Sequence, residues 1–283
     1  MSPYGKQGFI VQLVYLLLAI VWWAGTGFGF ALRRRVVVLC YHNVRANQRE
    51  RFGRQMRHIA DRARRLTTCE TVGWLGRPQM VVTFDDAFAG LLLNALPVTR
   101  DLEIPITIFA VTENLGGVPK WPMPEDHRDR DERTMTDLEL QTVDKDSRCR
   151  VESHTATHAN LAGISKQCVR EEFVRSRLRL EKILGRDVTM LAFPFGAYGD
   201  DIIREARAAG YTDLFTLQPT LGRTSESNPL QGRFPADPDM WPAEFYLTTA
   251  GAYAWLGPWR RLLARLRKSF LVHSKPAQAP KTT

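Results

Sequence analysis

The stretch VVTFDDAFAG, residues 81–90, joins an apolar run to two adjacent carboxylates, Asp85 and Asp86. Its β-branched and aromatic side chains follow one another without alternation, which is typical of a strand buried on both faces of a parallel sheet. In such folds the polar residues that follow the strands meet at one rim, where ligands bind. We therefore expect Asp85 and Asp86 at a functional rim, with a partner that relieves the repulsion between them.

Similar apolar runs alternate with helical patterns on both sides of this stretch. Strands are predicted at residues 35–40, 80–84, 104–111, 150–153 and 188–193, and helices near 50–66, 87–99, 136–146, 165–184 and 199–209. The order βαβα indicates a parallel sheet with helices outside it, either open or closed into a barrel. Residues 113–135 are long for a plain connection, so this segment is either a substrate-facing loop or a solvated charged loop.

The composition indicates one large domain with appendages. The chain has 283 residues, of which 44% are hydrophobic and 24% charged, enough to bury a sizeable core. Its net charge of +9 is unevenly placed: residues 33–65 hold eleven arginines against two acids, residues 255–275 hold six basic residues and no acid, and the rest of the chain carries −6. Such segments suit lipid headgroups or nucleic acid. No nucleic-acid-binding motif accompanies them, so we expect no nucleic acid partner.

Residues 1–34 are predicted to form a membrane anchor. No charged residue occurs from Gln7 to Leu32, and a helix of these 26 residues could span a bilayer core of roughly 30 Å. Trp22 and Trp23 occupy positions typical of an interfacial aromatic belt. We interpret the segment as a single-pass anchor in the cell membrane that contacts lipid through residues 7–32. A cleaved signal peptide and a buried core helix are the alternatives, and the side of the membrane that holds the domain is left open.

The carboxy-terminal segment, residues 255–283, carries an amphipathic pattern. Apolar residues recur at helical spacing from Trp255 to Phe270, with arginines between them. The pattern predicts a basic amphipathic helix that binds membrane lipid through residues 255–271. A terminal helix that docks on the domain by the same apolar stripe is an equal alternative.

Two histidines four residues apart, His154 and His158 in VESHTATHAN, follow another predicted strand. On one helical turn this spacing would point both imidazoles the same way. Two histidines and a carboxylate are a common ligand set for a catalytic divalent metal ion. The spacing alone is weak support, but together with the strand-terminal Asp85 and Asp86 it favours a metal site at the rim.

Four motifs together resemble a known family. They are LCYHNV (39–44), TFDDAF (83–88), SHTATH (153–158) and LAFPFGAYGD (191–200), in that order along the chain. They are similar to the polysaccharide deacetylases of the NodB homology type, carbohydrate esterase family 4, over roughly residues 35–255. The resemblance implies that residues 35–254 form an α/β domain, a distorted (β/α) barrel of about seven repeats.

The resemblance also implies an activity and a cofactor. Members of the family hydrolyse an N-acetyl group from an amino sugar, so we expect a metal-dependent hydrolase that acts on an N-acylated polysaccharide or lipid-linked glycan. The cofactor would be one divalent metal ion, zinc in first place, with cobalt or another divalent ion as alternatives. A glycan-binding or assembly protein that lost catalysis on the same fold is the alternative function.

Residue by residue, the resemblance assigns Asp85 as the general base and Asp86, His154 and His158 as the metal ligands. This division suits the chemistry, because a carboxylate that binds a metal is not free to accept the proton of the attacking water. The backbone N–H of Phe195 would hold the oxyanion of the tetrahedral intermediate. Retention of the base beside a complete ligand set favours an enzyme over a binding protein.

Four further residues are accessory candidates. Pro194 begins the turn that carries Phe195, and Tyr198 either helps that ring to wall the sugar site or belongs to the core. His42 follows the first predicted strand and either reaches the rim or is a structural histidine. Asp213 lies near the fourth motif of the family without matching it well.

The sequence departs from the fuller family pattern in two places. Many members have an arginine two residues before the motif proline, where it orients the catalytic carboxylate, and here that position is Ala192. The late L-x-x-H motif that supplies a histidine general acid is also missing, and His273 is interpreted as a tail residue. Arg233 is assigned to the last barrel strand. The groups that orient Asp85 and that act as general acid are therefore left open.

Overall fold

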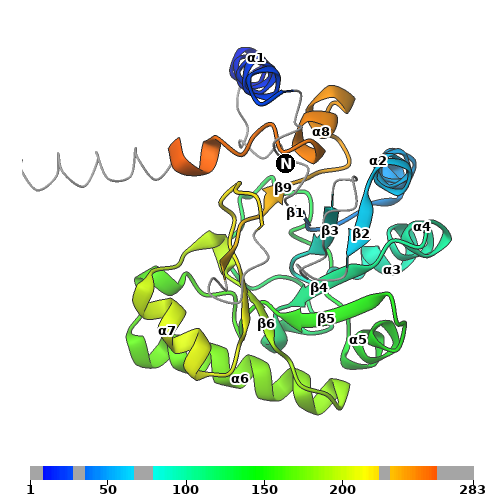
Figure 1. The fold of residues 1–283 in the computed structure, drawn as a ribbon. Helices are drawn as coiled ribbons and strands as arrows, with labels where there is room; N and C mark the ends of the chain where they lie inside the picture. The colour runs from blue at the N-terminus through cyan, green and yellow to red at the C-terminus, as the bar shows by residue number, and fades with distance from the viewer. Residues whose placement is uncertain (1–8, 28–35, 67–78, 223–229, 260–283) are drawn as a thin grey trace, which may run out of the picture.

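The computed structural model describes residues 9–27, 36–66, 79–222 and 230–259, and its centre is a curled parallel sheet (Figure 1). The strands follow the order β8-β7-β6-β5-β4-β3-β1-β9, and β2 also pairs with β3. Their bounds are β1 (Val36–Tyr41), β2 (Arg64–Leu66), β3 (Gln79–Phe84), β4 (Ile106–Ala110), β5 (Cys149–Ser153), β6 (Met190–Ala192), β7 (Asp213–Phe215), β8 (Leu230–Gln231) and β9 (Phe234–Pro235). Among these described strands β8 and β9 do not pair, so the predicted α/β fold is confirmed as an open, curled sheet.

Helices cover the outside of the sheet (Figure 1). They are α2 (Arg49–Arg62), α3 (Gly90–Asn94), α4 (Leu96–Asp101), α5 (Asp137–Asp144), α6 (Lys166–Leu184) and α7 (Asp200–Ala208). All the helices and strands that the sequence predicted in the domain are present. The predicted helix 87–99 divides into α3 and α4, because Pro97 lacks a backbone N–H and is suited to the first turn of a new helix.

Both faces of the sheet are buried in apolar side chains. The inner face carries one cluster, composed of Val36, Val38, Val81, Phe109, Met190, Ala192 and Phe215. The alternating residues of β1, such as Val37 and Leu39, belong instead to the larger cluster shared with the helices. The strands therefore appear in the sequence as continuous apolar runs. The polar residues of the predicted site follow the strands, although a few buried polar residues such as Thr107 and Glu152 lie within them.

The amino-terminal helix α1 (Phe9–Gly25) packs against α8 (Pro242–Thr249). Gln12 Nε2 donates to Glu244 Oε2 at 3.0 Å, and the rings of Trp23 and Tyr246 meet edge to face with their centroids 5.9 Å apart. Of the helices that the structure describes, none is both long enough and apolar enough to cross a membrane. The prediction of a single-pass anchor in residues 1–34, and of a cell-membrane location that rests on it, is wrong.

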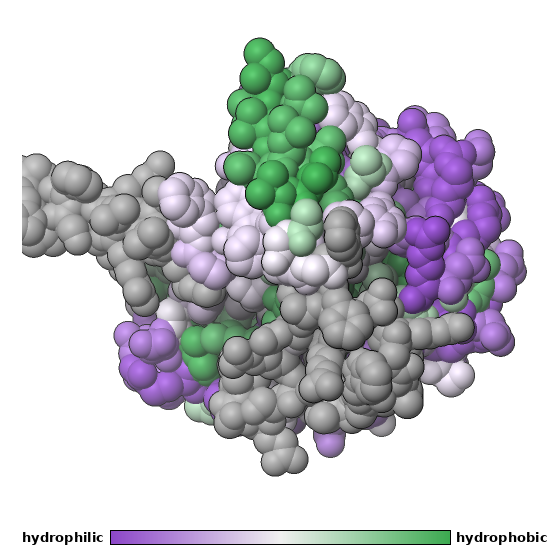
Figure 2. Space-filling model, turned by 45° about the horizontal axis from the view of Figure 1, so that its top comes forward, coloured by the Kyte–Doolittle hydropathy of each residue, from purple (hydrophilic) through white to green (hydrophobic). Residues whose placement is uncertain are grey.

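The length of α1 gives the physical reason for this correction. Within the described residues the helix runs from Phe9 to Gly25, which is 17 residues or about 25 Å, and this falls short of a bilayer core of roughly 30 Å. One side of α1 packs on α8. The other side exposes apolar side chains such as Ile10 and Val21, and it forms the continuous green ridge in Figure 2. The absence of charge in the sequence indicated an apolar helix but not how long that helix is.

The carboxy-terminal segment is described only to residue 259. Within it, the ring of Trp255 stacks on Tyr15 of α1 with centroids 6.2 Å apart, and Trp259 is exposed. The rest of the predicted amphipathic helix, residues 260–271, lies outside the described residues. Its lipid contact and the domain limits at residues 34 and 254 stay predictions.

Candidate active site

The sequence motifs converge at the carboxyl ends of neighbouring strands. β3 ends just before Asp85 and Asp86, and β5 ends just before His154. His154 Nε2 lies 3.7 Å from Asp85 Oδ2 and 3.7 Å from Asp86 Oδ1, and His158 Nε2 lies 3.5 Å from the same Asp86 oxygen. The parallel sheet thus brings the four residues together at its rim, although they are separated by up to 73 positions in the sequence.

Asp86, His154 and His158 form a buried group that fits a divalent metal ion. Each offers a ligand atom within 4.8 Å of the others. Asp86 Oδ1 and His158 Nδ1 have no hydrogen-bond partner among the residues that the structure describes. Burial and the neighbouring charge of Asp85 raise the pKa of Asp86, so its ionised form needs a cation nearby. Two imidazoles and one carboxylate are a donor set that zinc accepts while keeping a position open.

Both histidines are held in the neutral form that binds metals. Burial lowers the pKa of His154 to about 4 and that of His158 to about 2. The Nδ1–H of His154 donates to the carbonyl oxygen of Ala192 at 2.8 Å, which leaves Nε2 as the nitrogen with a free lone pair. The expectation that the two histidines share a helical turn is wrong, because residues 154–160 form a loop.

The backbone around this group is strained. Six described residues other than glycine have a positive φ, and five of them belong to the site: Asp86 (69°), Ala87 (54°), Thr155 (70°), His158 (61°) and Phe195 (56°). Each such residue costs on the order of 1–3 kcal/mol and persists only where its surroundings enforce it. Such a concentration of strain at one rim supports a functional role for these loops.

Asp85 is the other buried carboxylate, and its partner is Arg233. Arg233 Nη1 donates to Asp85 Oδ1 at 2.5 Å and Nη2 donates to Oδ2 at 2.7 Å. Burial alone would raise the pKa of Asp85, but the guanidinium of Arg233 holds it well below its usual range. Asp85 is therefore ionised and held in a fixed orientation. The sequence left open which group orients Asp85, because Ala192 stands where many family members have an arginine. In the structure that group is Arg233, the residue before β9.

Two further side chains, Cys40 and His42 at the end of β1, lie beside Asp85. Cys40 Sγ donates to Asp85 Oδ2 at 3.3 Å, and burial raises the pKa of its thiol, which stays protonated. A nitrogen of His42 lies within 4.8 Å of an Asp85 oxygen. This trio does not fit a metal ion, because Arg233 already binds both Asp85 oxygens and would repel a second cation. The exposed side chain of His42 reaches the rim, as one of the two alternatives predicted.

Comparison with known proteins gives the family. Residues 75–214 match the family model of the polysaccharide deacetylases.

The chain contains a polysaccharide deacetylase domain.

This confirms the family that the four motifs resemble. The curated protein YxkH of Bacillus subtilis, assigned to the polysaccharide deacetylases, is 24% identical over 140 residues, which cover 50% of this chain and 45% of YxkH. The chain therefore matches less than half of the length of that relative.

Solved structures share the fold of this deacetylase domain. IcaB from Ammonifex degensii superposes with a TM-score of 0.64 and 23% identity, and the match covers 76% of this chain and 97% of IcaB. The Streptococcus pyogenes deacetylase PplD, solved in complex with acetate, gives a TM-score of 0.63 and 18% identity over 76% of this chain and 98% of PplD. At these identities the likeness establishes the fold alone.

Of the remaining predicted residues, Phe195 and the turn that carries it lie beside His158, whereas Tyr198 packs against the core. Pro194 is buried and begins a turn in which Gly196 adopts a φ of 64°, where a Cβ would lie 2.9 Å from that of Leu217. Phe195 lies at the apex of the turn, 49% exposed, with its ring centroid 4.6 Å from that of His158. Tyr198, in contrast, stacks on Phe193 and packs against the core.

Asp213 does not reach the rim. It is the first residue of β7, where it pairs with Met190, so it lies at the amino end of a parallel strand. Its carboxylate accepts a hydrogen bond from the hydroxyl of Thr212. The structure therefore removes Asp213 from the accessory candidates of the deacetylase domain.

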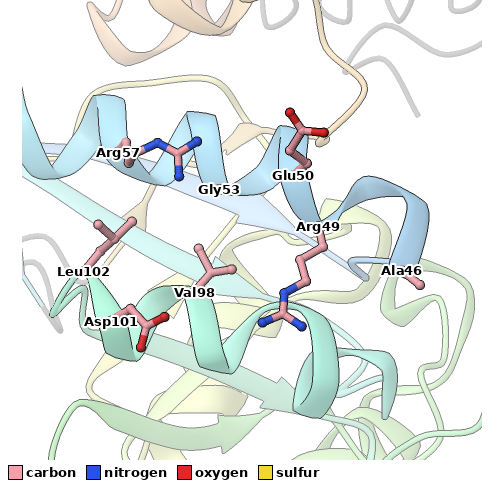
Figure 3. A pocket seen from close by; sticks show the side chains of 8 residues that line it. All are labelled: Ala46, Arg49, Glu50, Gly53, Arg57, Val98, Asp101 and Leu102. Atoms are coloured by element: carbon pink, nitrogen blue, oxygen red, sulfur yellow. The ribbon is translucent and has the colours of Figure 1, made fainter.

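In the described part of the arginine-rich segment, α2 carries five of the arginines on the outside of the sheet. A groove of about 510 Å³ between α2 and α4 is lined by Arg49 and Arg57 and by apolar side chains that include Val98 (Figure 3). No residue of the catalytic motifs lines this groove. Two other arginines of α2 pair with acids, Arg51 with Asp239 and Arg54 with Glu50. This part of the segment is best described as a solvated helix face.

The buried pair of Asp85 and Arg233 gives a stability prediction. Arg233→Met leaves an unpaired buried carboxylate and should lower the free energy of unfolding by about 3–5 kcal/mol, measured by urea denaturation of the full chain. Arg54→Met, which removes an exposed pair with Glu50, is the matched control and should cost less than about 1 kcal/mol. Adding Asp85→Asn to Arg233→Met should recover part of the loss, and the absence of any recovery would contradict the prediction.

Proposed function

We propose that the chain is a metal-dependent hydrolase that removes an N-acetyl or other N-acyl group from an amino sugar of a polysaccharide or lipid-linked glycan. The observation that carries the proposal is the unequal environment of two adjacent carboxylates. Asp85 is paired with a buried arginine, whereas Asp86 faces two neutral histidines with one oxygen left without a hydrogen bond. Two neighbouring carboxylates whose environments shift their pKa values in opposite directions typically take different roles in catalysis.

The group formed by Asp86, His154 and His158 would hold one divalent ion, zinc in first place and cobalt as an alternative. When bound, such an ion polarises an acyl carbonyl and lowers the pKa of a water molecule. Asp85 is the proposed general base, since its carboxylate is ionised, fixed by Arg233 and 3.7 Å from His154 Nε2. It would take a proton from the attacking water. The N–H of Phe195, at the apex of its turn, is the proposed donor to the oxyanion.

The departing amine needs a proton, and His42 is the proposed donor. Its side chain is exposed at the rim and carries a nitrogen within 4.8 Å of the base carboxylate. Among the described residues of the rim it is the histidine that the proposed metal group leaves unused. Desolvation by the groups around the rim lowers the pKa of His42 below its ordinary value, so its protonated fraction near neutral pH is small and its protonated form is a strong donor. Hydrolysis would then yield the carboxylate of the acyl group and a free amine.

The sugar would contact the exposed ring of Phe195, since apolar rings commonly wall ligand sites. Tyr198 is a weaker candidate for this contact because its ring packs on Phe193. A glycan-binding protein without catalysis is the alternative function. The ionised base beside the metal-binding group supports the enzyme, because binding alone does not require it.

The first test is acetate release from N-acetylglucosamine oligomers by the full chain with added zinc or cobalt. We expect release that stops on chelation and falls by about 10²–10⁴-fold in Asp85→Asn. Asp201→Asn, which changes an exposed carboxylate on α7 that pairs with Arg204, is the matched control and should keep the wild-type rate. A wild-type protein that binds the metal and N-acyl glycans but releases no carboxylate would support the binding protein instead.

The role of His42 is tested separately. His42→Ala should lower kcat by about 10²-fold or more while metal affinity, measured by calorimetry, stays unchanged. His58→Ala removes a histidine of α2 that contacts Thr249 outside the rim, and it serves as the control. Equal kcat values for the wild type and His42→Ala would exclude His42 as the proton donor.

A further inference from the structure

The imidazole of His158 packs against two aromatic rings. Trp121 stacks on it with centroids 4.8 Å apart and an interplanar angle of 30°, and Phe195 meets it edge to face at 4.6 Å and 75°. Trp121 belongs to the segment 113–135. This segment is far in sequence from the motifs that contain His158 and Phe195. No feature of the sequence indicated this contact.

The two histidines of the group are held in different ways. His154 has the usual support of a metal ligand, a hydrogen bond from its second ring nitrogen to the carbonyl of Ala192. His158 lacks it, since its buried Nδ1 has no partner within the described part of the chain. Besides the Asp86 oxygen that lies 3.5 Å from its Nε2, the His158 ring is oriented by packing, and Trp121 stacks on its face.

The segment that carries Trp121 is fixed firmly enough for this role. Trp121 packs with Phe88 and Val111 in a small buried cluster beside the rim. The N–H of Met135 donates to the carbonyl of Ala87 at 2.8 Å, which ties the end of the segment to the residue that follows Asp86. The same segment thus contacts both the aspartate motif and the histidine motif.

A direct contact between Trp121 and a sugar is not favoured. Trp121 is only 7% exposed, and one face of its ring is covered by His158. The alternative of a substrate-facing loop, predicted for residues 113–135, therefore does not apply to this side chain. Phe195, which is half exposed, has the free face that Trp121 lacks.

We infer that Trp121 is a positioning residue that fixes the His158 ring by stacking, so that the metal affinity of the group depends on an aromatic side chain at position 121. The inference rests on the proposed function for the existence of the metal site. In this inference the segment 113–135 is a structural support of the metal site. Removing the stacked ring should act on metal binding as the loss of a supporting hydrogen bond does at other sites.

The test compares two substitutions of similar apolar character in the full chain. Trp121→Leu keeps an apolar side chain but loses the stacked ring, whereas Trp121→Phe keeps a ring. After metal removal by chelation, Co²⁺ and Zn²⁺ are titrated by calorimetry, and the visible spectrum of the Co²⁺ form reports the ligand geometry. Trp121→Leu should bind about 10–100-fold more weakly with an altered spectrum, and Trp121→Phe should stay near the wild type.

Controls separate this inference from the proposed function. Trp241→Leu, which removes a ring that contacts Phe9 far from the rim, should leave Co²⁺ affinity unchanged. Equal affinity and spectra for Trp121→Leu and the wild type would overturn the inference even if acetate release is confirmed. Weaker binding in Trp121→Leu would support it even if no substrate is hydrolysed. A wild-type protein that binds neither ion would overturn both.

Discussion

The buried pair of Arg233 and Asp85 is the interaction on which the rest of the rim depends. Two adjacent carboxylates cannot both stay ionised inside a protein unless each has its own compensating charge. Arg233 supplies that charge for Asp85 from within the curled sheet, where it also lies 5.4 Å from the centre of the Phe109 ring. Asp86 has no such arginine, and its nearest partners are the neutral side chains of His154 and His158, with which it could share a metal ion. The proposed division of roles between Asp85 and Asp86 thus follows from the position of Arg233.

The sequence predicted most of the fold because the strands are buried on both faces. Runs such as VVTF before Asp85 are continuous enough to be recognised without a partner strand. The same logic placed Asp85, Asp86 and His154 at strand ends, and the sheet brings them together. The prediction of a membrane anchor was wrong for a related reason. Composition shows that residues 7–32 are apolar, but it does not show where α1 ends or that α1 packs on α8.

The contacts that the sequence did not reveal are those between distant segments. Arg233 lies 148 positions after Asp85, and Trp121 contacts His158 from the segment between β4 and α5. Neither residue stands in a motif with its partner, so no spacing could connect them. His158 was expected on a helical turn, yet its positive φ places it in a loop whose geometry depends on those contacts. The sequence assigned Arg233 to the last barrel strand, but nothing in the residues around it, QGRF, indicated Asp85 as its partner.

The pairing of β9 with β1 determines how much of the chain must be synthesised before the rim can form. Leu39 and Phe234 are neighbours in the sheet, so the first and last strands of the domain meet only when nearly the whole chain is present. A nascent chain that ends before residue 233 has no counterion for Asp85, and burying that carboxylate early would cost several kcal/mol. The rim therefore cannot be completed before residue 233 has been synthesised. A chain truncated before this point would carry the aspartate and histidine motifs without the positive charge that balances Asp85.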